Sequence, residues 1–107
     1  MISHDVFFSL RDASAEAIAR LITACETHFR DHPGVVWFTA GGLEPELDRP
    51  VNDRDFHVGL HITFRDRASH DAYQKAPAHT RFIAENQDNW AMVRVFDSVV
   101  EGGAGRK

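Results

Sequence analysis

Tyr73 and His79, six positions apart, are the residues of this sequence best suited to acid–base chemistry. They flank Pro77 in the stretch AYQKAPAHTRF, where the proline can redirect the chain so that both side chains point inward. A neutral imidazole accepts protons near neutral pH, and a phenol can hold an oxygen that gains negative charge. The pair would therefore suit removal of a proton from the carbon next to a carbonyl group.

His4 is a third candidate, because it shares one face of an N-terminal strand with apolar residues. We expect it to orient a polar group of a ligand or to pair with His79. The apolar wall of the predicted pocket comprises Val6, Phe8, Leu10, Phe64 and Phe82. The pattern predicts a pocket for a small molecule, with no metal and no organic cofactor.

A purely structural role for these residues stays open. A buried tyrosine hydroxyl needs a hydrogen-bond partner, and a histidine just after a helix-breaking proline is a natural one. Tyr73 and His79 would then fasten a broken helix to the sheet, and His4 would be a satisfied histidine at the end of a strand. We expect His70 to lie in solvent.

The remaining histidines give little support for a metal site. His28 and His32 have the spacing of a helical metal pair, but they straddle the predicted end of a helix and no nearby acid or cysteine completes a site. His57 and His61 lie on one strand face but roughly 13 Å apart by strand rise, too far to share an ion. Across a two-fold axis each would instead meet a second subunit.

The composition is that of a single globular domain of 107 residues, with 43% hydrophobic and 26% charged residues. A net charge of −4 argues against a nucleic-acid partner. No apolar run approaches the ~18 residues of a membrane span, and the N-terminus lacks a basic signal-peptide region. Cys25 is the single cysteine, which excludes an internal disulfide and fits a core position. We therefore expect a cytoplasmic protein.

The candidate residues must be positioned by four strands and two helical regions. Alternating or β-branched segments predict strands, three- and four-residue spacing predicts helices, and Pro77 divides the second helical region in two. The order is β-α-β-β-α-β, an α+β ferredoxin-like fold with an antiparallel sheet and helices on one face. We expect a domain over residues 1–100 and a flexible tail over 101–107. The strands are predicted at 2–10, 35–41, 56–64 and 90–100, the helices at 14–31, 66–75 and 77–89, and an exposed loop at 42–55.

The other face of this sheet is predicted to be too apolar for water. Phe56, Val58, Leu60, Ile62 and Phe64 alternate along the third strand and suit the helix side. Large apolar patches usually mark an interface, so we expect two sheets to pack face to face in a homodimer. The alternative is a monomer covered by its tail or its long loop. The predicted interface residues are Phe7, Trp37, His57, Gly59 and His61.

Five segments of the chain form a recognisable combination: HDVFFSLRD, HPGV, FHVGLHITFRD, AYQKAPAHTRF and VRVFDSVV. Through them the chain resembles the stress-responsive A/B barrel (Dabb) family of the dimeric α/β-barrel superfamily. The matching segments span about residues 3–100, and Y-x-x-x-P-x-H-x-x-F is the most specific of them. One departure is Ala76, where relatives often have histidine.

This resemblance implies a barrel-like dimer and leaves two classes of function open. Relatives of the olivetolic acid cyclase type close a polyketide by aldol condensation without metal or organic cofactor, and by motif position their histidines and tyrosine match His4, His79 and Tyr73. The superfamily fold also supports cofactor-free monooxygenases. Many other members have no known reaction and some are linked to stress responses, which implies a stress-associated or ligand-binding dimer with a structural His–Tyr pair.

Overall fold

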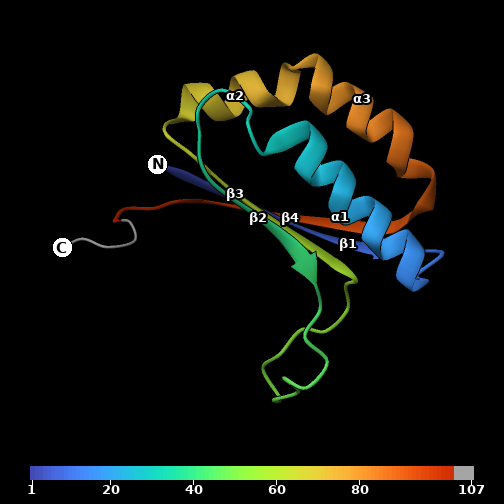
Figure 1. The fold of residues 1–107 in the computed structure, drawn as a ribbon. Helices are drawn as coiled ribbons and strands as arrows, with labels where there is room; N and C mark the ends of the chain where they lie inside the picture. Colours follow the sequence, from blue (N-terminus) through green and yellow to red (C-terminus); the bar gives the residue numbers. More distant parts are fainter. Residues whose placement is uncertain (103–107) are drawn as a thin grey trace.

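The computed structural model describes residues 1–102, and the sheet and helices take the predicted order. Four antiparallel strands are arranged as β2-β3-β1-β4, with all three helices on one face (Figure 1). This confirms the ferredoxin-like α+β fold. The predicted flexible tail lies, from residue 103 on, outside the described residues. The elements are β1 (Ile2–Leu10), α1 (Ala15–Phe29), β2 (Val35–Gly42), β3 (Val58–Phe64), α2 (Arg67–Lys75), α3 (Pro77–Asn86), the 3-10 turn η1 (Gln87–Asn89) and β4 (Trp90–Val99).

Local sequence signals explain where the helices begin and end. The side chain of Ser14 accepts a hydrogen bond from the Ala17 amide and caps α1. Ala76 ends α2 and caps α3 in an extended conformation, because the residue before a proline is pushed out of the helical region. Pro77 therefore separates two helices that share one face of the sheet.

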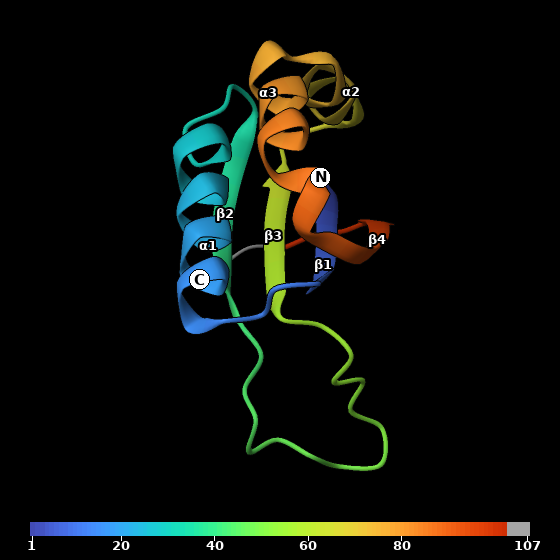
Figure 2. The same ribbon diagram turned by 90° about the vertical axis from the view of Figure 1, so that its right-hand side faces the viewer.

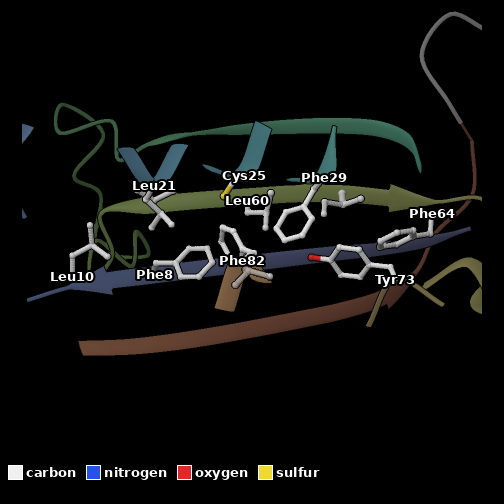
Figure 3. Packing of buried hydrophobic residues seen from close by; sticks show 12 residues of the cluster. Phe8, Leu10, Leu21, Cys25, Phe29, Leu60, Phe64, Tyr73 and Phe82 are labelled. Carbon is white, nitrogen blue, oxygen red and sulfur yellow. The ribbon is translucent and has the colours of Figure 1, made fainter. Parts of the chain in front are cut away.

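The core lies between that face and the helices (Figure 3). α1 contributes a buried stripe that includes Leu21, Cys25 and Phe29. Cys25 is fully buried, and this burial raises the pKa of its thiol to about 12, so it is a core residue as expected. Among residues 1–102, no helix is both long and apolar enough to cross a membrane. The sheet contributes Val6, Phe8, Leu10, Val58, Leu60, Ile62 and Phe64.

The face of the sheet away from the helices, called the open face below, carries large apolar side chains in water. Trp37 is 59% exposed, Phe96 53% and Met92 38%. The ring of Phe7 packs against that of Phe96, with centroids 5.8 Å apart. The apolar surface predicted on this face is therefore present.

The connection between β2 and β3 covers only part of the open face. Most of it projects beyond the end of the sheet (Figure 2). Its last residues bend back, so that Asp53 accepts a hydrogen bond of 2.6 Å from Arg94 and the ring of Phe56 packs 4.9 Å from that of Phe7. The loop thus leaves Trp37 and Phe96 exposed.

The alternation predicted for the third strand is wrong at its start. β3 begins at Val58, and Phe56 lies on the open face beside Phe7 rather than under the helices. His57 is held at the end of β1, where its Nδ1 accepts a hydrogen bond of 2.9 Å from the Leu10 amide. The pairing of β1 with β4 shifts register between Ser9 and Leu10, so the Leu10 amide takes a side-chain partner instead.

Gly59 and His61 lie in the middle of the open face. A side chain at Gly59 would come within 3.1 Å of His61 Nε2 and 3.4 Å of the Phe7 ring. The space that glycine leaves is thus taken by Phe7 and His61 of the same chain. His61 Nδ1 lies 2.7 Å from Asp5 Oδ1. This pair gives the apolar face a polar centre.

Candidate functional site

A cavity of about 340 Å³ lies between the sheet and the helices α2 and α3. Val93, Val95 and Asp97 of β4 line one side of it, and Val95 is 49% exposed. Leu10 and Phe64, two residues of the predicted wall, lie in the buried core and do not line it. The other predicted site residues do line it: His4, Val6, Phe8, Tyr73, His79 and Phe82.

Tyr73 lines this cavity, and its side chain is also part of the buried core. Its ring packs between Phe29 and Phe64, with centroid distances of 5.1 and 4.9 Å. Figure 3 shows its hydroxyl directed inward along the sheet. Burial, and to a lesser degree nearby Cys25 and Asp97, raises the pKa of this phenol well above its ordinary value of 10. Tyr73 is therefore a protonated hydrogen-bond donor near neutral pH.

His79 lies in the first turn of α3, where Pro77 turns the chain toward the sheet. Its ring meets Tyr73 edge-to-face, with centroids 4.9 Å apart. The hydrogen bond expected between the two side chains is not among the contacts of the described residues. Burial, followed by the proximity of other histidines with His4 foremost, lowers the pKa of His79 below its ordinary value of 6.5. His79 is therefore a neutral base near neutral pH.

His4 pairs with an acid that the sequence analysis overlooked. It is 5% exposed, and its Nδ1 lies 2.6 Å from Asp97 Oδ1, since the two residues are opposite each other on β1 and β4. His4 does not pair with His79. Its ring instead contacts Tyr73, at a centroid distance of 5.6 Å. Asp97 could have been found from the alternation of Val93, Val95 and Asp97, which all line the cavity.

His70 does not lie in solvent, contrary to what was expected. It lines the cavity, and its side chain is only 15% exposed. Its Nδ1 lies 3.1 Å from Asp71 Oδ1, and its Nε2 lies 3.9 Å from Asp97 Oδ1. The available signal was its position three residues before Tyr73, which puts both side chains on one face of α2. The site thus holds four ionisable groups around one tyrosine.

Two nitrogen atoms in the cavity wall, His70 Nε2 and Trp90 Nε1, are buried and have no hydrogen-bond partner among residues 1–102. Buried polar groups are nearly always paired, with protein, water or ligand. These two atoms come from α2 and from the start of β4. They are therefore points at which a bound molecule would find hydrogen-bonding partners.

His28 and His32 do not form the metal pair considered for them. Nδ1 of His28 donates to the Ala24 carbonyl at 2.9 Å, and its Nε2 lies 3.6 Å from Glu85. Nδ1 of His32 lies 3.1 Å from the Pro33 carbonyl, and its ring packs edge-on to Tyr73. Each imidazole is thus engaged separately.

Solved structures share this fold across nearly the whole chain. A Dabb family protein of ferredoxin-like fold from Mesorhizobium loti is 24% identical, with a TM-score of 0.75 and coverage of 94% of this chain and 97% of that one. The hydroxynitrile lyase from Passiflora edulis is 19% identical, with a TM-score of 0.74 and coverage of 97% and 96%. A dimeric ferredoxin-like protein of unknown function from Thermobifida fusca is 17% identical, with a TM-score of 0.74 and coverage of 92% and 90%.

At these identities the structural likeness shows the fold alone. The chain has no significant match among curated proteins. Its sequence does match the family model of the stress responsive A/B barrel domain, Dabb, over residues 2–100. That match contains every element of the sheet and the helices, together with the whole lining of the cavity. The chain belongs to the Dabb family of stress responsive A/B barrel domains.

Proposed function

We propose that the chain works in the cytoplasm as a homodimer whose subunits each bind a small carbonyl compound in the cavity and enolise it. His79 takes a proton from the carbon next to the carbonyl, and Tyr73 donates a hydrogen bond to the enolate oxygen. In a polyketide-like molecule with a second carbonyl, the enolate carbon attacks that carbonyl and forms a carbon–carbon bond. The His79 imidazolium then returns its proton to the new alkoxide, so no redox partner is needed.

The observation that carries this proposal is the placement of a neutral base beside a protonated donor on one cavity. The rings of His79 and Tyr73 are 4.9 Å apart, and both residues line the cavity. The pKa of His79 is lowered and that of Tyr73 is raised, so each is in the protonation state that its role needs. The cavity volume, about 340 Å³, lies at the lower end of the range of small-molecule sites.

A molecule bound in this cavity would also have to form hydrogen bonds with the two unpaired nitrogen atoms. Phe8, Phe82 and Trp90 form an apolar wall, while His70 Nε2 and Trp90 Nε1 await partners. An aromatic or acyl chain with a hydroxyl group and a carbonyl group would fill the apolar part, donate to His70 Nε2 and accept from Trp90 Nε1. A polyketide-like compound has this composition.

Replacing Tyr73 by phenylalanine tests the role of the phenol. The probe is acetophenone in D₂O, with exchange of its methyl hydrogens followed by proton NMR. We expect the wild-type protein to accelerate exchange and Tyr73→Phe to lose about 10²–10³-fold of that acceleration, as for removal of one oxyanion donor. The ring and its packing on Phe29 and Phe64 remain, so the fold is kept.

The matched control is His32→Ala. The His32 ring also packs on Tyr73, at 5.6 Å, but it does not line the cavity. We expect this variant to exchange acetophenone as fast as the wild type. Equal exchange in wild type, Tyr73→Phe and buffer would contradict the proposed chemistry.

The dimer in this proposal is supported by the open face. Trp37, Met92 and Phe96 form a mostly uncovered apolar surface on a sheet whose other face is already packed. A second copy that presents the same surface would cover it by face-to-face packing about a two-fold axis. The related Thermobifida fusca structure is described as dimeric. In this arrangement Phe7, Trp37, Gly59 and His61 meet their counterparts.

A non-catalytic, ligand-binding dimer associated with stress is the second candidate. The observation that favours it is the contact between Tyr73 and His79, which is an edge-to-face packing of rings rather than a hydrogen bond. In this function the pair holds α2 and α3 together, and the cavity stores or carries a compound without changing it. Binding of acetophenone without any accelerated exchange would favour this candidate over the first.

A further inference from the structure

We propose that His4, His70 and Asp97 bind a divalent transition-metal ion of the zinc class at the edge of the cavity. One ligand atom from each residue lies within 4.8 Å of the other two. The residues come from three different elements, β1, α2 and β4, which the fold brings together. The three residues line the same cavity as Tyr73 and His79, but the proposed enolisation gives them no role, so the inference does not depend on it.

The spacing of the three residues suits an ion of this size. Asp97 Oδ1 lies 2.6 Å from His4 Nδ1 and 3.9 Å from His70 Nε2. Zinc bonds to nitrogen and oxygen are about 2.0–2.2 Å long, which puts ligand atoms of a tetrahedral site roughly 3.3–3.6 Å apart. The ion would replace the proton shared by His4 Nδ1 and Asp97, which is released to solvent. Changes of about an ångström in side-chain position would then bring the three atoms into contact with one ion.

His70 is oriented as a metal-binding histidine would be. Its Nδ1 lies 3.1 Å from the Asp71 carboxylate, which makes Nδ1 the protonated nitrogen and leaves the lone pair on Nε2. Asp71 is itself held by Arg67 at 2.9 Å. A carboxylate behind a histidine is the usual outer support of a metal ligand. The lone pair of Nε2 points to a buried position where it has no partner.

The donor set indicates which ion would bind. Two imidazole nitrogens and one carboxylate oxygen suit zinc and its neighbours cobalt, nickel and iron(II), whereas magnesium and calcium prefer oxygen ligands. Asp97 is about half exposed, with 48% of its side chain accessible, which gives an ion a path from solvent. Three protein ligands leave a position for an oxygen atom of water or of a molecule in the cavity.

Metal binding is tested directly on the full chain after treatment with EDTA. Zinc alone is titrated by calorimetry, and cobalt(II) alone by its visible absorption, which reports coordination geometry. We expect one ion per chain with a dissociation constant in the micromolar range or tighter. We expect His70→Ala and Asp97→Asn each to weaken binding at least 10-fold, with the tetrahedral cobalt spectrum lost.

Two further variants distinguish metal binding at this site from metal binding by other histidines of the chain. His32→Ala removes an imidazole outside the cluster and should leave the affinity unchanged. Asp71→Asn removes the carboxylate behind His70, at a position 45% exposed where folding is not at risk, and should weaken binding about 10–100-fold. Circular dichroism checks that each variant is folded.

Either of two results would overturn the inference. The first is a dissociation constant above about 0.1 mM for both ions with the wild-type protein, because three such ligands bind far more tightly than that. The second is Asp71→Asn and Asp97→Asn binding as tightly as His32→Ala. Because no carbonyl compound is present in these titrations, their outcome is independent of the exchange assay.

Discussion

Replacing His79 by alanine is expected to remove about 10²–10⁴-fold of the acceleration that the protein gives to exchange in acetophenone. The imidazole is the only group in the proposed reaction that takes the proton from carbon. His79 is partly exposed in the first turn of α3, so its loss should leave the core intact. The measurement is the proton NMR exchange rate at equal protein concentrations.

The pH dependence of exchange gives the same prediction an independent readout. Because the pKa of His79 is lowered from 6.5, the imidazole stays neutral to a lower pH than an ordinary histidine. The wild-type rate should therefore rise with pH through a midpoint below 6.5 and level off above it. His79→Ala should lose this midpoint.

The same shift fixes the sign of the effect on stability. The unfolded chain takes up a proton on His79 as the pH falls through 6.5, before the folded chain does. This residue therefore lowers the stability of the fold as the medium becomes acidic, and this effect is absent well above pH 6.5.

If His79→Ala keeps the wild-type exchange rate and its pH midpoint, another group is the base and the assignment of His79 is wrong.

Replacing Phe96 by aspartate is expected to separate the two subunits of the proposed dimer. Phe96 is 53% exposed on the open face, beside Phe7, and it would be covered by the second copy. Loss of a central apolar anchor costs about 2 kcal/mol, and a two-fold interface contains the residue twice, so the dissociation constant should rise roughly a thousandfold. Light scattering coupled to size-exclusion chromatography measures the change in mass.

The matched control is Val51→Asp. Val51 is 84% exposed in the loop between β2 and β3, the greater part of which projects beyond the end of the sheet. An acid there should leave the mass of the particle unchanged. If Phe96→Asp has the wild-type mass at every concentration, or if Val51→Asp dissociates equally, the open face is not the contact between subunits.

The fold could be predicted because its local signals agree with its tertiary packing. The apolar stripe of α1 and the alternation from Val58 to Phe64 each define a buried face without reference to the rest of the chain. The break at Pro77 follows from backbone sterics alone. These three features place the helices over one face of the sheet and leave the other open.

The start of the third strand could not be predicted in the same way. Phe56 continues the alternation in the sequence, yet strand pairing stops at Val58, where the chain meets the irregular end of β1. His57 is used there by the Leu10 amide. Alternation in the sequence indicates which residues share a face of a strand. It does not indicate where hydrogen-bond pairing with the neighbouring strand ends.

Two of the four ionisable groups of the site, His70 and Asp97, were not predicted, for a related reason. His70 and Asp97 are 27 positions apart, and their proximity depends on how α2 lies over the edge of the sheet at β4. Tyr73 and His79 were found because a single proline joins them within one short motif. The contact of His4 with Asp97 arises from strand order, β1 beside β4, which no local pattern specifies.

In the proposed dimer the two faces of the sheet have different partners, the helices on one and a second copy of the chain on the other. Sedimentation equilibrium of the wild-type protein at about 1 μM tests this most directly, since a stable interface of ordinary size binds well below that concentration. We predict a particle of twice the chain mass. A folded particle of a single chain mass would contradict the proposal that a second copy covers Trp37 and Phe96.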